Sequence, residues 1–192
     1  MIRHAHLVGF GLAGALLMHQ LQKRGVRVTV NDRVDPQSSS HVAAGMITPI
    51  TGQRVKPTWR GQELQEFARR TYAELEHDLG ISLWKDWSLV RVFRTDTMRT
   101  WFEQRRDTGE LEQYSVEALN PGFHDGIEMP YGGFRHAGVA TVQMPTLLSA
   151  LRTKHAEAFV DQPDLSADVV VTCTGAAVLE DPRWSWLPIE PS

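Results

Sequence analysis

The first 32 residues change hydrophobic period twice, and the changes predict a strand, a helix and a second strand. Residues 5–8 form a short, mostly apolar segment that fits a buried strand. Apolar side chains then recur at helical spacing over residues 12–21, and Arg24-Gly25 marks the end of that helix. Valines alternate with polar residues over residues 26–30, as in a second strand. The pattern is typical of a β-α-β unit, from which parallel sheets are built.

The turn between the first strand and the helix has the spacing of a dinucleotide-binding motif. Gly9 can make the tight turn, Gly11 can let the backbone approach a pyrophosphate, and Gly14 can let the helix pack closely on the strand. Asp32 stands at the end of the second strand, where a carboxylate can accept hydrogen bonds from ribose hydroxyls. A 2′-phosphate would be repelled there, so the motif disfavours NADP.

The remainder of the chain predicts two changes of architecture. Residues 1–80 end with a helix over residues 61–79, whose apolar face consists of Leu64, Phe67, Ala68, Thr71, Tyr72 and Leu75. Residues 81–138 contain short alternating segments and glycine turns, which are typical of part of an antiparallel β substrate domain. Residues 139–192 return to the first block. The predicted fold class is α/β, with a Rossmann-like domain around a parallel sheet and part of a second, antiparallel β domain.

Individual elements of the later blocks can also be predicted. They are a strand at residues 89–93, an amphipathic turn at 98–106, a helix at 145–155, and a short strand at 158–160. Trp184 and Trp186 flank Ser185, so we expect them on one face of a strand as packing residues.

Composition argues against several classes of function. The chain has 192 residues, a net charge of −3 and no run of Lys or Arg, which disfavours a nucleic-acid-binding surface. Its apolar runs fall short of the roughly twenty residues of a membrane span, and we expect a cytoplasmic protein. The single Cys173 cannot form an internal disulfide or a cysteine metal site and is expected to be a small buried hydrophobe. The eight histidines lack metal-ligand spacing, so no metal is expected.

A stretch of small residues follows the β-α-β unit and narrows the choice of dinucleotide. By composition alone, Ser39 and Ser40 could belong to a plain serine-rich loop before a capped helix. Ala43-Ala44-Gly45-Met46, however, resembles the second flavin-contacting stretch of the D-amino-acid-oxidase-like FAD-dependent oxidoreductases, which include glycine oxidase and sarcosine oxidase. The likeness continues over residues 49–59. Residues 169–175 resemble the late strand of such flavoproteins, which ends in a small-Thr-Gly turn at the cofactor.

The resemblance implies a Rossmann-like FAD-binding domain and FAD as the cofactor. The residues expected to contact it are Gly9, Gly11, Leu12, Ala13, Gly14, Asp32, Arg33, Ser39, Ser40, Ala44, Gly45, Met46, Val160, Thr174 and Gly175. The glycine motif alone also fits an NAD-dependent dehydrogenase. The small-residue stretch and Cys173-Thr174-Gly175 oppose that alternative.

The activity implied by the resemblance is oxidation of a C–N bond in an amine or amino acid, with hydride transfer to the flavin. No catalytic side chain is assigned. His41, Arg54 and Lys56 could contact flavin, phosphate or substrate, or could be ordinary loop residues. Members of the family are longer, and their second half supplies an arginine for the substrate carboxylate and a segment that closes over the flavin. We therefore expect the N-terminal half of such an enzyme, either a fragment or a shortened form, with a non-catalytic dinucleotide-binding module as a further alternative.

Overall fold

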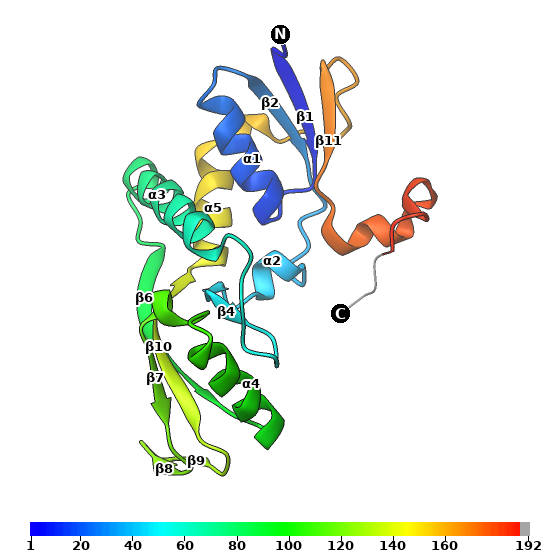
Figure 1. Cartoon of the computed structure of the whole chain (residues 1–192). Coiled ribbons are helices and arrows are strands. Elements are labelled where there is room, and N and C mark those ends of the chain that lie inside the picture. Colours follow the sequence, from blue (N-terminus) through cyan, green and yellow to red (C-terminus); the bar gives the residue numbers. More distant parts are fainter. Residues whose placement is uncertain (189–192) are drawn as a thin grey trace. The chain divides into compact units, whose positions relative to one another are not determined.

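Two compact units make up the structure, a computed structural model in which residues 1–188 are described (Figure 1). Unit 1 comprises residues 1–43 and the described residues from Met144 onward, and unit 2 comprises residues 44–143. The last residues of the predicted third block, 189–192, lie outside the described residues. Unit 2 is thus inserted in the sequence between the two segments that form unit 1.

Unit 1 is built on a three-stranded parallel sheet, as the sequence predicts. Strand β1 (His4–Val8) lies in the middle, between β2 (Arg27–Asn31) and β11 (Val169–Thr172), and the three lie side by side in Figure 1. Helix α1 (Leu12–Gln22) connects β1 to β2. The register pairs His6 with both Thr29 and Val170. The predicted β-α-β unit and the late strand are therefore both present.

The core of unit 1 depends on small residues as much as on large ones. The residues of α1 that are buried are Gly14, Ala15, Met18 and His19, whereas its leucines are only partly buried. Small side chains let the helix axis approach the sheet, where Ala5, Leu7 and Val30 are fully buried. Helix α5 (Met144–Lys154), predicted at residues 145–155, adds Leu147, Leu148 and Leu151 to the buried set.

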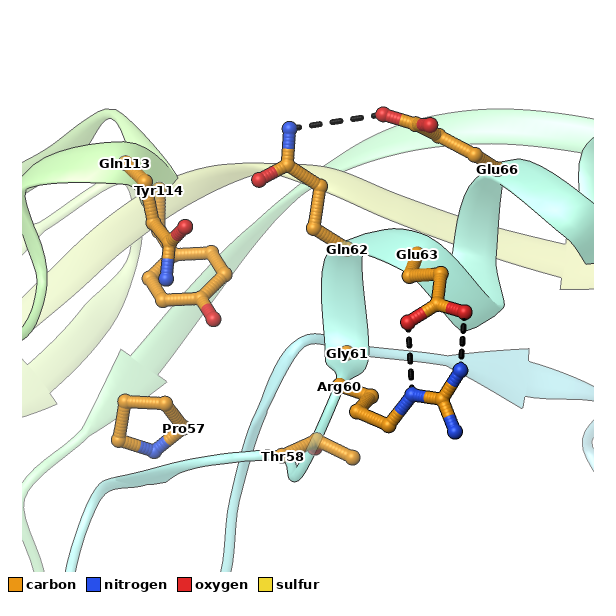
Figure 2. A pocket seen from close by; sticks show the side chains of 9 residues that line it. All are labelled: Pro57, Thr58, Arg60, Gly61, Gln62, Glu63, Glu66, Gln113 and Tyr114. Atoms are coloured by element: carbon orange, nitrogen blue, oxygen red, sulfur yellow. Dashed lines mark hydrogen bonds and ion pairs between the residues drawn. The ribbon is translucent and has the colours of Figure 1, made fainter.

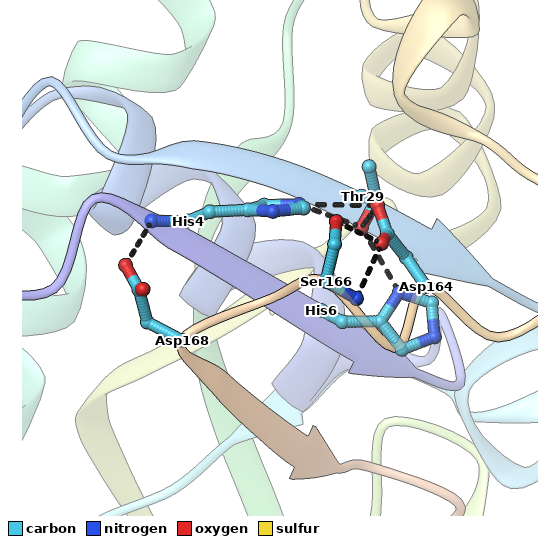
Figure 3. Close-up of polar contacts among 6 residues, drawn as sticks. All are labelled: His4, His6, Thr29, Asp164, Ser166 and Asp168. Carbon is cyan, nitrogen blue, oxygen red and sulfur yellow. Dashed lines mark hydrogen bonds and ion pairs between the residues drawn. The ribbon is translucent and has the colours of Figure 1, made fainter.

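A polar cluster fastens the loop before β11 to β1 and β2 (Figure 3). The hydroxyl of Thr29 lies 3.1 Å from Nε2 of His4 and 3.0 Å from Nδ1 of His6. Asp164, from the loop, lies 3.4 Å from His4 Nε2, and the Asp168 carboxylate accepts hydrogen bonds from the Arg3 and His4 amides at 2.7 and 3.0 Å. Burial lowers the pKa of His6. His4 and His6 therefore belong to a hydrogen-bonded cluster that helps to place β11.

Two predicted strands of unit 1 are replaced by 3-10 turns. Residues 158–160 were expected to form a strand, but Ala156–Ala158 forms the turn η2, and only Phe159 bridges to Val30 of β2. After the 3-10 segment η3 (Gly175–Glu180), Trp184 ends a further turn, η4 (Pro182–Trp184), and does not share a strand with Trp186. Local hydrogen bonds explain the second case, because the Asp181 carboxylate accepts from the Arg183 amide at 3.0 Å and begins the turn at Pro182.

Unit 2 contains the predicted antiparallel sheet. Its long strand β10 (Gly133–Val142) pairs with β6 (Trp84–Val92), and also with β3 (Met46–Ile47) and β7 (Val116–Leu119). A register shift between His136 and Val139 interrupts the β10–β6 ladder. Two small hairpins complete the unit: β4 (Ile50–Thr51) with β5 (Lys56–Pro57), and β8 (Gly122–His124) with β9 (Ile127–Met129).

An aromatic core joins this sheet to a helix that was predicted only as a turn. Residues 98–106 were predicted as a turn, but α4 (Asp96–Asp107) is a full helix that begins where the Thr95 hydroxyl accepts a hydrogen bond from the Met98 amide at 3.2 Å. Phe102 of α4 stacks on Phe134 of β10, with ring centroids 4.9 Å apart, and both are fully buried. The short turn η1 (Glu112–Tyr114) closes the same core.

Helix α3 (Gly61–Leu79) has the predicted bounds but buries only half of the predicted face. Thr71, Tyr72 and Leu75 are buried, while Leu64 and Phe67 are 47% and 59% exposed. The buried half packs near Trp84 of β6, and a bidentate ion pair from Arg69 to Asp86 joins the helix to that strand at 2.9 and 2.5 Å. The six-residue apolar face was therefore too long at its N-terminal end.

The boundary between the units differs from the predicted one. The prediction grouped residues 44–80 with the dinucleotide-binding block, whereas the structure places them in unit 2. The physical reason is pairing across a long sequence separation, since Met46 and Ile47 of β3 pair with Thr141 and Ala140 of β10. Such a pairing leaves no periodic signal in the local sequence.

Candidate functional site

Three loops of unit 1 meet at one edge of its parallel sheet. Gly9 follows the end of β1, Asp32 follows the end of β2, and residues 173–175 follow the end of β11. Because the strands are parallel, their carboxyl ends lie at the same edge. The chain leaves β1 toward β2 and returns on the other side as β11, which makes this edge a topological switch point, where open α/β sheets bind ligands.

Two glycines of the turn have no room for a side chain. Gly9 has a φ of +97°, and a Cβ atom there would lie 2.6 Å from the carbonyl oxygen of Cys173. A Cβ atom on Gly14 would lie 2.2 Å from the carbonyl oxygen of Gly9. Both contacts are with backbone, so the turn can be this tight only with glycine. These are the packing roles that the sequence assigned to the first and third glycines.

The second glycine of the motif, Gly11, lies beside Ser40. The Ser40 hydroxyl accepts a hydrogen bond from the Leu12 amide at 2.9 Å, and a Cβ atom on Gly11 would lie 2.9 Å from the same oxygen. Ser40 belongs to the one-turn helix α2 (Ser39–Val42). The positive end of the α1 dipole, with Ala13 in its first turn, therefore lies beside a hydroxyl in unit 1.

Asp32 is held by the glycine turn itself. Its Oδ1 atom accepts a hydrogen bond from the Phe10 amide at 3.0 Å, and its Oδ2 atom accepts one from the Val34 amide at 3.3 Å. The Gly9 amide donates to the carbonyl of Asn31 at 2.8 Å, which ties the same turn to the end of β2. The motif and the acidic residue, 23 positions apart at their extremes, thus form one hydrogen-bonded unit.

One residue of this region gave no signal in the sequence. Arg152, in the last turn of α5, forms an ion pair with Oδ2 of Asp32. Its guanidinium carbon lies 4.2 Å from the ring centroid of Phe159 and 5.2 Å from that of Phe10. The carboxylate expected to bind a ribose therefore has a cation beside it. An arginine near the end of a helix is common, and its partner is 120 residues away in the sequence.

The other predicted cofactor contacts are distributed over both units. Arg33 follows Asp32, and Val160 lies next to the bridge at Phe159, where its amide donates to the Val30 carbonyl at 2.9 Å. Thr174 and Gly175 begin the turn after β11. Ala44, Gly45 and Met46 belong to unit 2.

Gly45 has a structural requirement of its own. With a φ of +64°, it approaches β10 so closely that a Cβ atom would lie 2.0 Å from the carbonyl oxygen of Val142. The Val142 amide donates to the Gly45 carbonyl at 2.9 Å. A glycine here is thus explained by the packing of β10, whatever else the position does.

The three residues that could contact flavin, phosphate or substrate, His41, Arg54 and Lys56, have ordinary local surroundings. His41 Nδ1 lies 2.8 Å from the Ser38 hydroxyl. Arg54 lies over Trp101, 5.9 Å from the ring centroid, and Lys56 belongs to the β4–β5 hairpin. Cys173 is only partly buried and follows β11, so the prediction of a buried residue within the strand was wrong in part. Desolvation raises the pKa of its thiol, which keeps it protonated and unreactive.

Unit 2 has a hollow of about 530 Å³ at the N-terminal end of α3 (Figure 2). Its lining is polar, and Arg60 and Glu63 pair across one side at 2.6 Å from Nε to Oε2, which neutralises both charges. Desolvation is slight there, and the pKa of Glu63 is lowered by the hydrogen bond from Arg60. The predicted cofactor contacts do not line this hollow, and we assign no chemistry to it.

Two other kinds of site are absent from the part of the chain that the structure describes. It contains no group of three or more His, Cys, Asp or Glu side chains arranged to hold a metal ion. In the same residues, every helix is too short or too polar to span a bilayer.

Comparison with known proteins agrees with this geometry. The FAD dependent oxidoreductase family (DAO) matches residues 7–191. The uncharacterized oxidoreductase YurR of Bacillus subtilis (strain 168) is 38% identical over 205 residues, which cover 88% of this chain and 54% of YurR. These matches confirm the resemblance found in the sequence, and they confirm FAD over NAD as the cofactor of the family.

Solved structures show the same fold at lower sequence identity. Glycine oxidase from Geobacillus kaustophilus superposes with a TM-score of 0.72 at 19% identity, over 92% of this chain and 57% of that one. L-proline dehydrogenase from P. horikoshii superposes with a TM-score of 0.66 at 13% identity, over 98% of this chain and 57% of that one. The chain therefore spans little more than half the length of the proteins it matches.

Proposed function

The chain belongs to the FAD dependent oxidoreductase family, and on that basis we propose that unit 1 binds FAD across the carboxyl ends of β11, β1 and β2, within an enzyme that oxidises a C–N bond of an amine or amino acid. The observation that carries the proposal is the hydrogen bond from the Phe10 amide to Asp32. It joins the two groups that an adenine dinucleotide requires, a turn of close backbone amides and a carboxylate for the ribose.

Each part of the site has a distinct task in this proposal. The amides at the start of α1 and the positive end of its dipole bind the pyrophosphate, because Gly9, Gly11 and Gly14 allow the backbone to approach it. Asp32 accepts hydrogen bonds from the ribose, and Val160 flanks the adenosine. The turn at Thr174 and Gly175 contributes backbone groups from the end of β11. Leu12, Ala13, Arg33, Ser39 and Ser40 complete the unit 1 contacts, and Ala44, Gly45 and Met46 are proposed contacts from unit 2.

The chemistry follows from the cofactor and requires no side-chain nucleophile. When bound, FAD supplies a two-electron acceptor for hydride from the carbon next to the substrate nitrogen, and the imine product is hydrolysed by water. The residues of this chain bind and orient, since rigid placement of reacting groups is the protein's main contribution in such reactions. The glycine turn is well suited to this, because its backbone contacts allow little movement.

The substrate class rests on the similar proteins. Glycine oxidase and L-proline dehydrogenase are both named for amino-acid substrates, and both share the fold. Because this chain spans little more than half of each, amine oxidation is proposed for the whole protein and not assigned to side chains of unit 1 or unit 2.

The visible absorption spectrum of the purified full chain tests the proposal directly. We expect a flavin spectrum, release of FAD on denaturation, and a higher melting temperature when FAD is added. Peroxide production is then measured with glycine, sarcosine, proline and D-amino acids. A colourless protein whose melting temperature does not respond to FAD contradicts the cofactor assignment. Tightly bound FAD without turnover of any amine by the whole protein contradicts the proposed amine oxidation and leaves a dinucleotide-binding module.

A further inference from the structure

Arg152 alters how the Asp32 carboxylate, at the end of β2, can select a ligand. An isolated carboxylate at this position selects a ribose 2′-hydroxyl because it repels a 2′-phosphate. Here the Asp32 carboxylate is 15% exposed and already paired with the Arg152 guanidinium, whose side chain is 34% exposed. Repulsion between Asp32 and a 2′-phosphate is therefore weakened by a cation in contact with it.

Two aromatic rings hold the Arg152 guanidinium in addition to Asp32. Phe10 and Phe159 pack edge to face, with ring centroids 4.9 Å apart and planes at 79°. Arg152 lies over both rings, at 4.2 and 5.2 Å, so cation–π contacts hold it independently of Asp32. Loss of the carboxylate would consequently leave a guanidinium at the same place, without its counter-charge. A guanidinium is planar and offers paired donors that match the oxygens of a phosphate.

We propose that the Asp32–Arg152 pair, and not Asp32 alone, sets the choice between a ribose 2′-hydroxyl and a 2′-phosphate, and that Arg152 becomes a 2′-phosphate-binding residue when Asp32 is removed. In the wild-type protein Asp32 occupies the guanidinium and leaves a carboxylate lone pair for the hydroxyl. This inference rests on the proposed function, because it requires adenosine to bind at the end of β2.

The test measures binding of two adenosine nucleotides by calorimetry, without turnover. The probes are 5′-ADP and adenosine 2′,5′-bisphosphate, and the proteins are the full chain, Asp32→Ser, Arg152→Gln and the double variant. We expect wild-type protein to prefer 5′-ADP. Asp32→Ser should bind the bisphosphate about tenfold more tightly than wild type, the scale of one charge-assisted contact. The double variant should lose that gain.

Several controls make the result specific. Asp32→Asn keeps an oxygen to accept from the Phe10 amide and serves if Asp32→Ser does not fold. Arg24→Gln, in which an exposed arginine bonded to Gln20 is changed, should leave both affinities unaltered. Arg33→Gln tests the neighbouring cation. Arg152→Lys in the Asp32→Ser background keeps the charge but not the fork, and should retain only part of the gain.

Four results would overturn the inference. The first is that neither Asp32 variant gains affinity for the bisphosphate, and the second is that the gain persists in the double variant. The third is that Arg33→Gln removes the gain and Arg152→Gln does not, and the fourth is that Arg24→Gln removes it equally. In each of these, wild-type protein still binds FAD and 5′-ADP, so the proposed function stands. If wild-type protein binds neither FAD nor 5′-ADP, the proposed function itself fails, and the inference fails with it.

Discussion

A Cβ atom on Gly14 would lie 2.2 Å from the carbonyl oxygen of Gly9, so the first turn of α1 rests on the backbone of the turn that follows β1. Gly14→Ala should therefore push the helix away from the sheet, and we expect a loss of about 1–3 kcal/mol in the free energy of unfolding. Chemical denaturation measures this. Ala13→Ser, at the exposed neighbouring position, is the control and should change little. An unaltered midpoint for Gly14→Ala would show that the turn relaxes without cost.

Asp32→Ala should weaken FAD binding by about 1.5–3 kcal/mol, the usual range for hydrogen bonds to a charged group. The matched control is Asp35→Ala in the same loop, where the carboxylate accepts a hydrogen bond from the Gln37 amide at 2.8 Å. A fluorescence titration with FAD gives both dissociation constants. Equal affinities for the two variants would place the adenosine elsewhere.

His136 should make the stability of unit 2 depend on pH. It is fully buried, and burial together with the nearby charge of Arg91 lowers its pKa, although the Ala137 carbonyl acts in the opposite direction. Below the unfolded pKa of about 6.5 the unfolded chain binds a proton that the folded chain does not, so stability falls as the pH is lowered. The slope from this residue is limited to about 1.4 kcal/mol per pH unit.

His136→Phe removes the titrating group and keeps a ring beside Phe134. We expect a flatter dependence of unfolding free energy on pH between about 6.5 and 5 than in wild type. His77→Asn changes an exposed histidine and should leave the slope as it is. A wild-type slope in the His136→Phe protein would attribute the pH dependence to other groups, such as His6 and His155, whose pKa values burial also lowers.

Asp86 offers a direct spectroscopic test of how α3 is attached to β6. Hydrogen bonds from Arg69 and from the Trp84 indole at 2.9 Å lower the pKa of Asp86 to about 2. Arg69→Met should raise that pKa toward 3.8, as followed by NMR during titration. Trp84→Phe should raise it less, because the Arg69 hydrogen bond is the larger cause. A pKa near 2 in the Arg69→Met protein would mean that the ion pair does not form in solution.

Local pattern was sufficient for the elements of the β-α-β unit and for the bounds of α3. In these segments the apolar period and the glycine that follows each helix are both features of the local sequence. Local pattern failed for α4, because Met98 and Phe102, which contact the core, are outnumbered by charged and polar residues and give a weak apolar period. It also failed at Trp184, where a proline and an aspartate cap favour a turn over a strand.

The candidate site was predictable only in its local parts. Gly9 to Gly14 and Asp32 are signalled by spacing, because each residue type is required by its own backbone contact or by the proposed ligand. Arg152 could not be predicted, since its contact with Asp32 depends on how α5 packs beside Phe159. The contact between Gly45 and Val142 is equally non-local, and it gives that glycine a purpose that the sequence had attributed to the flavin alone.

The insertion of unit 2 between the halves of unit 1 has a consequence for the order of folding. Arg3 and Asp168, which join β1 to the start of β11, are 165 residues apart in sequence. Once Gly45 and Val142 are paired, the effective loop between Arg3 and Asp168 is shortened by more than half. This lowers the entropic cost of closing that loop by on the order of 0.8 kcal/mol. The third strand of the parallel sheet, β11, is therefore expected to dock last, after the inserted unit has formed.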